Sequence, residues 1–340
     1  DSLVRTQSAG YTKIGAILVS SLAAALTANV VDVAVRSSAS AMLVYGSGQL
    51  SLFTVQCAGW WNVTNVSISS LAIVVERGSL MNATAFAANC LDVIGIGAPF
   101  LEPSLTPRPE GKLLNDRNVW RLNATNITSV IRSGSSVVFS TYRGAGGSSG
   151  RIAIMTLAPY QLFVNYPPLH RPVEVHCERV DFAVIEASIA LSVRGSYFAA
   201  VVALWFIPYR SPLSTMMSIH AVDVALSLHG AVIDVQGEFN DVSVNSICAR
   251  SAGNFTVVRV TNATLAINAS SRIALLLSLA TVPLSAANRF ATQPSMLSSI
   301  VLGRRSAISL IHLSVNSESR VNMWHASGVA AFVEKKRYSL

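Results

Sequence analysis

The chain has 340 residues, of which 51% are hydrophobic and only 12% charged. This apolar supply is enough for a sizeable core and excludes a largely disordered chain. The formal net charge is +8, but most arginines are scattered singly rather than gathered in the dense patches of nucleic-acid interfaces. We therefore expect no nucleic-acid partner.

The first apolar stretch runs from Ile14 to Val31 and reads IGAILVSSLAAALTANVV. It has the character of a signal-peptide core, approaches the length of a membrane helix, and also fits the first coil of a repeat structure. The coil is favoured because the stretch leads directly into a repeated unit, and the other two interpretations stay open. No other apolar stretch is long enough to span a membrane.

The repeated unit begins with Val-Asp, continues with alternating apolar residues, and closes on a glycine. Its copies are residues 31–46 (VDVAVRSSASAMLVYG), 180–195 (VDFAVIEASIALSVRG) and 222–237 (VDVALSLHGAVIDVQG); residues 63–78 keep the spacing but lack the aspartate. One unit has too few apolar groups to bury a face alone, so copies must stack on one another. The alignment predicts that Asp32, Asp181 and Asp223 occupy matching positions with a turn or capping role.

Nearly every segment is short, rich in Val, Ile, Leu and Ala, and bounded by Ser, Asn or Gly, which predicts an all-β fold. Strand–turn–strand units of uneven length favour a right-handed parallel β-helix, with residues 1–340 as one body that is part of a larger protein. The alternative is an antiparallel β-sandwich, although the Asn-Gly and Asp-Gly hairpin signals do not occur. Residues 273–279 and 328–333 are the best candidates for short helices.

All twelve prolines fall in four places along the chain. Because proline cannot donate to a sheet ladder, these places are predicted to be loop excursions from the β-helix body. Their boundaries are 98–118, 158–172, 207–213 and 282–295. A basic tail follows at 334–340.

Two features indicate an extracellular protein. The chain has four cysteines without any CxxC pair, so two disulfides are one interpretation and buried free thiols the other; they are Cys57, Cys90, Cys177 and Cys248. Eight Asn-x-Ser/Thr sites exceed what this composition gives by chance, which indicates N-glycosylation. These asparagines are Asn62, Asn65, Asn82, Asn123, Asn126, Asn254, Asn262 and Asn268.

The sequence VEVHCERVD contains the strongest candidate for chemistry. Glu174, His176 and Glu178 alternate, so a strand would place them on one face with Cys177 opposite. Together with Asp181 they are weak candidates for acid–base catalysis or metal binding, against the simpler interpretation of a solvated strand face.

Other candidates are weaker. Residues 146–150 match G-x-S-x-G around Ser148, but the flanking sequence lacks the helix that a nucleophile elbow needs. Two His/Asp pairs, His220 with Asp223 and His229 with Asp234, carry little signal. The chain has only seventeen acidic residues, spread thinly. We therefore expect no enzyme activity, no metal and no cofactor, with a polysaccharide lyase or hydrolase as the alternative.

The stretches at residues 31–46, 62–80 (NVTNVSIS and LAIVVERGSL) and 262–277 (NATLAINASSRIALLL) resemble the dispersed gene family surface proteins of trypanosomatids and other kinetoplastids. The resemblance extends over most of the chain as a general similarity of sequence character, without an exact motif. It implies a membrane-associated surface glycoprotein with a pectate-lyase-like β-helix and an adhesive role, attached to the membrane through a segment outside this chain. The expected location is extracellular or on the cell surface, and the expected partners are host-cell or matrix glycans or surface proteins.

Overall fold

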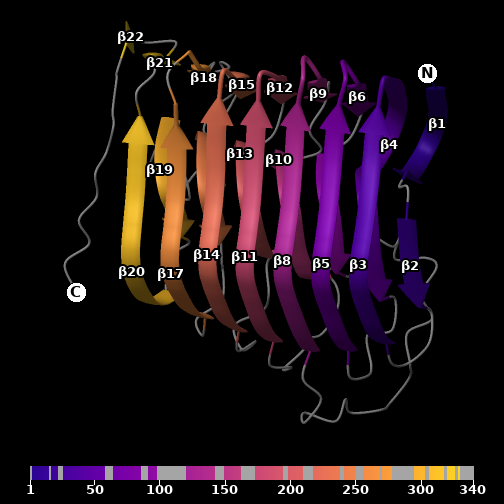
Figure 1. The fold of residues 1–340 in the computed structure, drawn as a ribbon, viewed down its shortest axis with the longest axis vertical. Helices are drawn as coiled ribbons and strands as arrows, with labels where there is room; N and C mark the ends of the chain where they lie inside the picture. The colour runs from indigo at the N-terminus through magenta and orange to yellow at the C-terminus, as the bar shows by residue number, and fades with distance from the viewer. Residues whose placement is uncertain are drawn as a thin grey trace, which may run out of the picture.

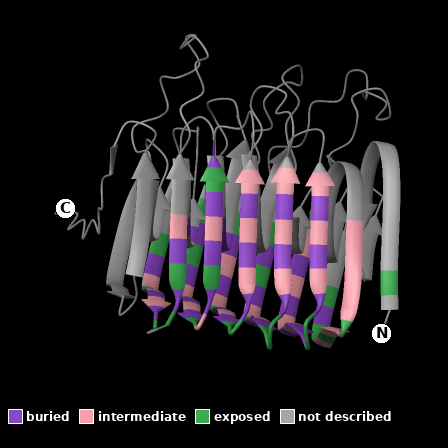
Figure 2. Cartoon of the chain, turned by 90° about the horizontal axis from the view of Figure 1, so that it is seen from above, coloured by how far each residue is buried: buried purple, intermediate pink, exposed green. Residues whose placement is uncertain are grey.

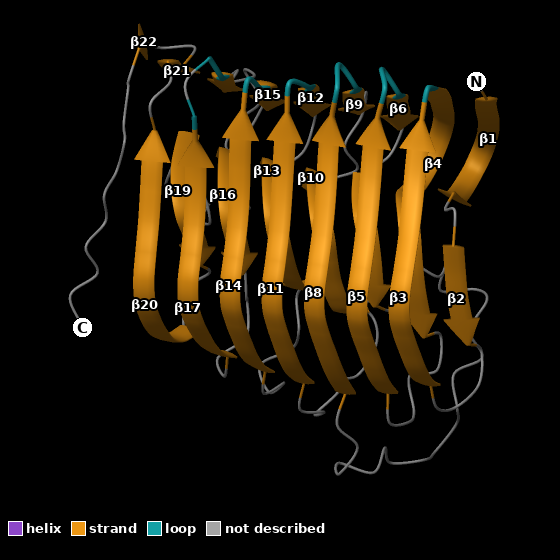
Figure 3. Cartoon of the chain, viewed as in Figure 1, coloured by secondary structure: helices purple, strands orange, loops and turns teal. Residues whose placement is uncertain are grey.

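In the computed structural model, the described part of the chain is built from strands. It comprises residues 2–14, 17–21, 26–57, 64–85, 91–97, 120–141, 149–161, 173–193, 198–209, 217–237, 241–249, 256–268, 270–277, 295–302, 306–317, 320–325 and 328–329. Within these ranges the chain forms strands β1 to β22 and no helix (Figure 3). The prediction of an all-β fold is confirmed.

Seven strands form one sheet, in which they lie side by side along the molecule (Figure 1). In sheet order they are β20 (Ser306–Ser317), β17 (Thr256–Ile267), β14 (Met217–His229), β11 (Val173–Ile185), β8 (Trp120–Arg132), β5 (Thr64–Glu76) and β3 (Leu26–Ser38).

The second sheet has fifteen strands and two arms, which the long strand β4 (Ser40–Cys57) joins. One arm contains β6 (Leu80–Ala85), β9 (Ser136–Thr141), β12 (Ser188–Val193), β15 (Val232–Gly237), β18 (Arg272–Leu277), β21 (Arg320–His325) and β22 (Gly328–Val329). The other contains β7 (Leu91–Gly97), β10 (Ser149–Gln161), β13 (Phe198–Tyr209), β16 (Asp241–Ala249) and β19 (Ser295–Leu302). Strands β1 (Ser2–Ile14) and β2 (Ile17–Ser21) also pair with β4.

From β5 to β21 the chain follows a three-strand repeat, since each strand pairs with the strand three places later. The strand β11, for example, pairs with β8 on one side and with β14 on the other. Every pairing among the described strands is parallel except the two-residue contact of β21 with β22. The antiparallel β-sandwich alternative is therefore wrong, and the prediction of stacked parallel strands is confirmed.

The strands of the seven-stranded sheet bury alternate side chains. Near the middle of each strand this alternation shifts once by one residue. In β5, Val66 and Ile68 are buried before the change, and Leu71, Ile73 and Val75 after it. Two successive residues point away from the core at the change of phase. The second of them has a positive φ in six strands, at Asp32, Ser70, Asn126, Arg179, Asp223 and Asn262. Figure 2 shows the alternating buried and less buried bands that result.

These six residues occupy equivalent positions, because the strand pairings align their flanking residues in each case. A left-handed backbone conformation suits Asn and Asp better than other non-glycine residues, and four of the six are Asn or Asp. The predicted turn role of Asp32 and Asp223 is confirmed. Asp181 is a correction: it lies two residues past the equivalent position and pairs with Ala225.

The copy proposed at residues 63–78 is also out of phase. Val31 pairs with Ser69, whereas the sequence alignment matched Val31 with Val63. Alternating apolar residues fit such a unit equally well when it is shifted by an even number of positions. Only the pairing of neighbouring strands removes this ambiguity.

A tight corner connects each strand of the seven-stranded sheet to the short strand that follows. A small buried residue lies at this corner in five coils, namely Ser79, Ser135, Ala187, Ala231 and Ser271. The turn before it contains left-handed residues, such as Arg77 and Gly78 in one coil and Gly230 in another. A Cβ atom at Gly230 would lie 3.4 Å from Glu186 Cγ, an ordinary van der Waals contact. Glycine is favoured there because its φ is 57°.

The core consists of columns of apolar side chains that run across the coils. Leu71, Ile127, Val180 and Val224 form one such column, and each is fully buried. Burial of side chains of this size contributes roughly 1.5–3 kcal/mol each. The column is continuous because parallel pairing brings the same position of every coil into contact.

Several sequence predictions need correction. Residues 273–277 of the first helix candidate form most of β18, and Gly328 and Val329 of the second form β22. Strands β10 and β13 include Pro159 and Pro208, so these two prolines belong to strand ends, where the β10·β13 pairing shifts register. The excursion 98–118, most of 282–295, the remainders of 158–172 and 207–213, and the basic tail 334–340 lie outside the described residues.

The apolar stretch after Ile14 contains β2 and the beginning of β3, as expected for a coil. In the described part of the chain, no helix is long and apolar enough to cross a membrane.

We predict that the left-handed bend limits substitution at Arg179, which has a φ of 55°. Replacing Arg179 by Val should lower the free energy of unfolding by about 1–2 kcal/mol, because a β-branched side chain opposes this conformation. Arg179→Gly should be neutral or stabilising. Denaturant unfolding measures both changes, with Ser227→Val in β14 as the control at an outward position. Equal effects of Val and Gly at position 179 would contradict the assigned bend.

Candidate functional site

The outward face of β11 carries the residues that the sequence singled out. Glu174 and Asp181 are exposed, and His176 and Glu178 are half-buried, whereas Cys177 is fully buried. The prediction that Glu174, His176 and Glu178 share one strand face, with Cys177 opposite, is confirmed. Asp181 joins that face because the bend at Arg179 shifts the alternation by one residue.

Basic side chains balance the two glutamates. Glu174 Oε2 accepts a hydrogen bond from Arg121 Nε of the preceding coil at 2.8 Å. Glu178 lies 3.5 Å from Arg179 Nε and 3.8 Å from His176 Nε2. All these side chains are well exposed, so each ion pair contributes only about 0–1 kcal/mol. The arrangement is that of a solvated strand face with local charge pairing.

His176 has a second histidine beside it. It pairs in register with His220 of β14, and the two ring centroids are 5.1 Å apart at an angle of 59°. Arg259 of β17 follows next to His220 in the same column. Within the described residues, no group of three or more His, Cys, Asp and Glu side chains is arranged to hold a metal ion.

The carboxylate of Asp181 is affected by its surroundings near the bend. Partial burial, and to a lesser extent the negative charge of Asp223, raise the pKa of Asp181 above its usual value. Asp223 Oδ1 accepts a hydrogen bond from Asn262 Nδ2 at 2.6 Å, so the left-handed column is also linked by side chains.

The other two candidate pairs have different partners. His229 Nδ1 lies 3.3 Å from Asn268 Nδ2, and Asp234 accepts hydrogen bonds from Gln236. The Ser148 of the G-x-S-x-G match lies outside the described residues.

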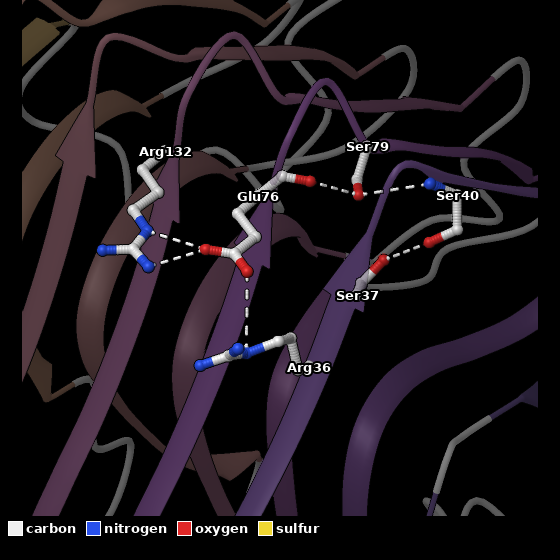
Figure 4. A network of polar contacts seen from close by, with 6 residues as sticks. All are labelled: Arg36, Ser37, Ser40, Glu76, Ser79 and Arg132. Atoms are coloured by element: carbon white, nitrogen blue, oxygen red, sulfur yellow. Dashed lines mark hydrogen bonds and ion pairs between the residues drawn. The ribbon is translucent and has the colours of Figure 1, made fainter. Parts of the chain in front are cut away.

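A charge cluster that is more buried than the ion pairs of β11 lies at the corner after β5. The sequence patterns described above did not predict it. Glu76 is only 7% exposed, and its Oε2 atom accepts hydrogen bonds from Arg132 Nε at 3.0 Å and from Arg132 Nη2 at 2.6 Å (Figure 4). Arg36 of β3 lies 3.6 Å from the other oxygen. One carboxylate therefore links three successive coils. The signal available in the sequence was an arginine followed by serine or glycine at two successive corners, in ERGS and IRSGS.

The same corner contains a serine network. Ser79 Oγ donates to the carbonyl oxygen of Glu76 at 2.7 Å and accepts from the amide of Ser40 at 3.4 Å, and Ser37 and Ser40 join their hydroxyls at 2.7 Å (Figure 4). Ser135 occupies the equivalent corner one coil later, where its buried hydroxyl finds no partner. The Glu76 cluster therefore orders one end of the stack and has the character of a structural clamp.

The described sequon asparagines all have side chains outside the core. Asn123, Asn126, Asn262 and Asn268 are exposed, and Asn65 and Asn82 are half-buried. Asn126 and Asn262 also occupy the left-handed bend, so the backbone gives them a reason to be asparagine that does not depend on a glycan. Asn62 and Asn254 lie outside the described residues.

Cys177 is a free thiol in the core. Of the two interpretations that the sequence left open, the free thiol therefore holds for Cys177, whose neighbours in the column are Ala124 and Ala221. The side chains of Cys57, Cys90 and Cys248 are not among those described.

No family model, no curated protein and no solved structure matches this chain. The arrangement of residues described above is therefore the basis for assigning a function.

We predict that Glu76 makes stability depend on pH. The hydrogen bonds from Arg132, together with the charges of Arg132, Arg36 and Arg77, hold the pKa of Glu76 below its usual value. Because the pKa of Glu76 is lower in the folded state, its ionised form stabilises the fold at pH values above the unfolded-state pKa of about 4.3. This stabilisation is lost as the pH falls through the folded-state pKa. Unfolding titrations should therefore show Glu76→Gln less stable than wild type at neutral pH, with the difference vanishing in acid. Glu178→Gln is the matched control on an exposed pair. A constant difference across this range would contradict the clamp.

We also predict that Cys177 does not react while the protein is folded. Burial raises the pKa of its thiol far above the usual value, and only the thiolate reacts with alkylating reagents. Mass-spectrometric mapping after iodoacetamide treatment should find Cys177 unmodified in native protein and modified in denaturant. Rapid modification of Cys177 in the native protein would contradict the inward orientation of its side chain in β11.

Proposed function

We propose that this chain is a right-handed parallel β-helix that acts as a structural or adhesive scaffold of an extracellular or cell-surface glycoprotein, without catalytic activity of its own. The β-helix is supported by the parallel pairing of each strand with the strand three places later. The right hand follows from the strong preference of parallel crossover connections. Such a stack provides long, regular outer faces, which suit display and adhesion.

The observation that carries the proposal is the distribution of sequons over these faces. Of the six sequons that the structure describes, five lie within or directly after strands β5, β8 and β17, all of one sheet. None lies in β11 or β14, which sit between β8 and β17 in that sheet. Glycans on β5, β8 and β17 would frame a bare strip. The strip has the outward charged or histidine residues Glu174, His176, Glu178, Arg179, Asp181, His220 and Asp223.

We propose that this strip is the adhesive surface, facing host-cell or matrix glycans or surface proteins. A partner can bind exposed polar residues on a rigid scaffold without any rearrangement of the scaffold. Neighbouring basic side chains neutralise Glu174 and Glu178, which favours recognition over acid–base chemistry. The proposal includes membership of the kinetoplastid dispersed gene family, which only the sequence resemblance of residues 31–46, 62–80 and 262–277 supports.

The test is to secrete the chain from eukaryotic cells and measure three properties. We expect a loss of mass on treatment with peptide-N-glycosidase, no products from a panel of polysaccharides, and binding to immobilised matrix proteins or glycans. Asp181→Arg should reduce that binding several-fold, whereas Asp234→Arg, the same charge change on β15, should not. Polysaccharide cleavage that disappears in Asp181→Asn would support the lyase or hydrolase alternative instead. A secreted chain without glycans and without binding would refute the proposal.

A further inference from the structure

Two neighbouring coils place a histidine at the same position of the outer face. His176 of β11 pairs in register with His220 of β14, and the two ring centroids are 5.1 Å apart at an angle of 59°. Neighbouring strands of a sheet lie about 4.8 Å apart, so side chains at paired positions emerge side by side. The two imidazoles are therefore brought together by strands of the sheet and not by loops, which gives them a well-defined separation.

This separation suits a metal ion shared by the two rings. An ion bound about 2.0–2.1 Å from one nitrogen of each ring, near the tetrahedral angle, places the two ring centroids roughly 5 Å apart. Neutral imidazole is a common ligand of Zn²⁺, Cu²⁺ and Ni²⁺. Because His176 is half-buried and His220 is exposed, an ion can reach the pair from solvent and keep water at its remaining positions.

The charged groups around the pair include a carboxylate close to it. Glu178 Oε2 lies 3.8 Å from His176 Nε2, while the other oxygen of Glu178 lies 3.5 Å from Arg179 Nε. Arg259 follows His220 in the same row, but its side chain is exposed, and water and salt screen such a charge. The Glu178 oxygen that faces His176 would therefore stabilise a cation bound at the pair.

We propose that His176 and His220 bind one divalent transition-metal ion, of the class of Zn²⁺, on the outer face of the stack. The two ring nitrogens are the protein ligands, the Glu178 carboxylate adds electrostatic stabilisation, and water completes the coordination. The ion links β11 to β14 from outside. Its water-filled positions are open to a carboxylate or an imidazole of a partner.

This site differs from the expectation of no metal that the sequence provided. In the sequence the two histidines belong to separate units, and only the register of β11 with β14 brings them together. The inference goes beyond the proposed function, since it depends on this strand pairing and not on the adhesive role of the strip.

Calorimetric titration of the purified full chain with ZnCl₂ tests the proposal, after a chelator has removed any metal retained during purification. We expect His176→Ala and His220→Ala each to weaken Zn²⁺ binding by about tenfold or more, because strand pairing holds the second imidazole beside the first at a high effective concentration. His229→Ala is the matched control. It removes an exposed histidine from the same strand β14 and should leave Zn²⁺ binding unchanged.

Electron paramagnetic resonance provides a second readout that a purely structural role of the histidines would not give. With one equivalent of Cu²⁺, which binds imidazole more tightly than Zn²⁺ does, wild type should show two coordinated imidazole nitrogens. His220→Ala should show fewer, whereas His229→Ala should keep both.

Circular dichroism separates loss of the site from loss of the fold. If an alanine variant does not fold, the glutamine variant at the same position is the second test. A wild type that binds no Zn²⁺, or folded His176→Ala and His220→Ala chains that bind it as tightly as wild type, would overturn the proposal. Partner binding by the chelator-treated chain is measured separately, so a failure of the metal site and a failure of the adhesive function are distinguishable.

Discussion

Parallel register between successive coils is the constraint on which the rest of the structure depends. Apart from Arg179 at the bend, each residue of β11 has one partner in β8 and one in β14, at the same position of the repeat. Residues at one position must therefore share one orientation, inward or outward, in every coil. The core columns, the left-handed bends and the small corner residues all follow from this requirement.

The same register creates the polar contacts. Glu76 and Arg132 are 56 residues apart in sequence, yet they occupy the same corner in neighbouring coils. Asp223 and Asn262 meet in the same way at the bend, and His176 and His220 meet on the outer face. These contacts differ in how far water reaches them. The Glu76 carboxylate is almost covered and joins three coils, whereas the outward pairs remain exposed and contribute little to stability.

The functional proposal follows from what the outer faces present. A scaffold whose strands repeat a few positions many times spreads its polar groups in columns and does not gather them in one cleft. In the strip on β11 and β14, His176 and His220 lie in one such column, and the glutamates of β11 pair with Arg121 of β8 and with Arg179. This distribution favours recognition of an extended partner, and the sequons on the flanking strands of the sheet define where that partner could approach.

The sequence by itself determined the all-β composition, the stacking of short units, and the shared face of Glu174, His176 and Glu178, because each of these depends on local alternation. It could not determine the phase of the repeat: Asp181 was matched with Asp32 and Asp223 although it lies two positions away. Nor could it separate the short apolar strand β18 from a helix, since six residues suit both. Only the tertiary structure decided these points, along with the partners of Glu76 and the free state of Cys177. The physical reason is that pairing between coils, and not the pattern within one coil, selects which residues meet.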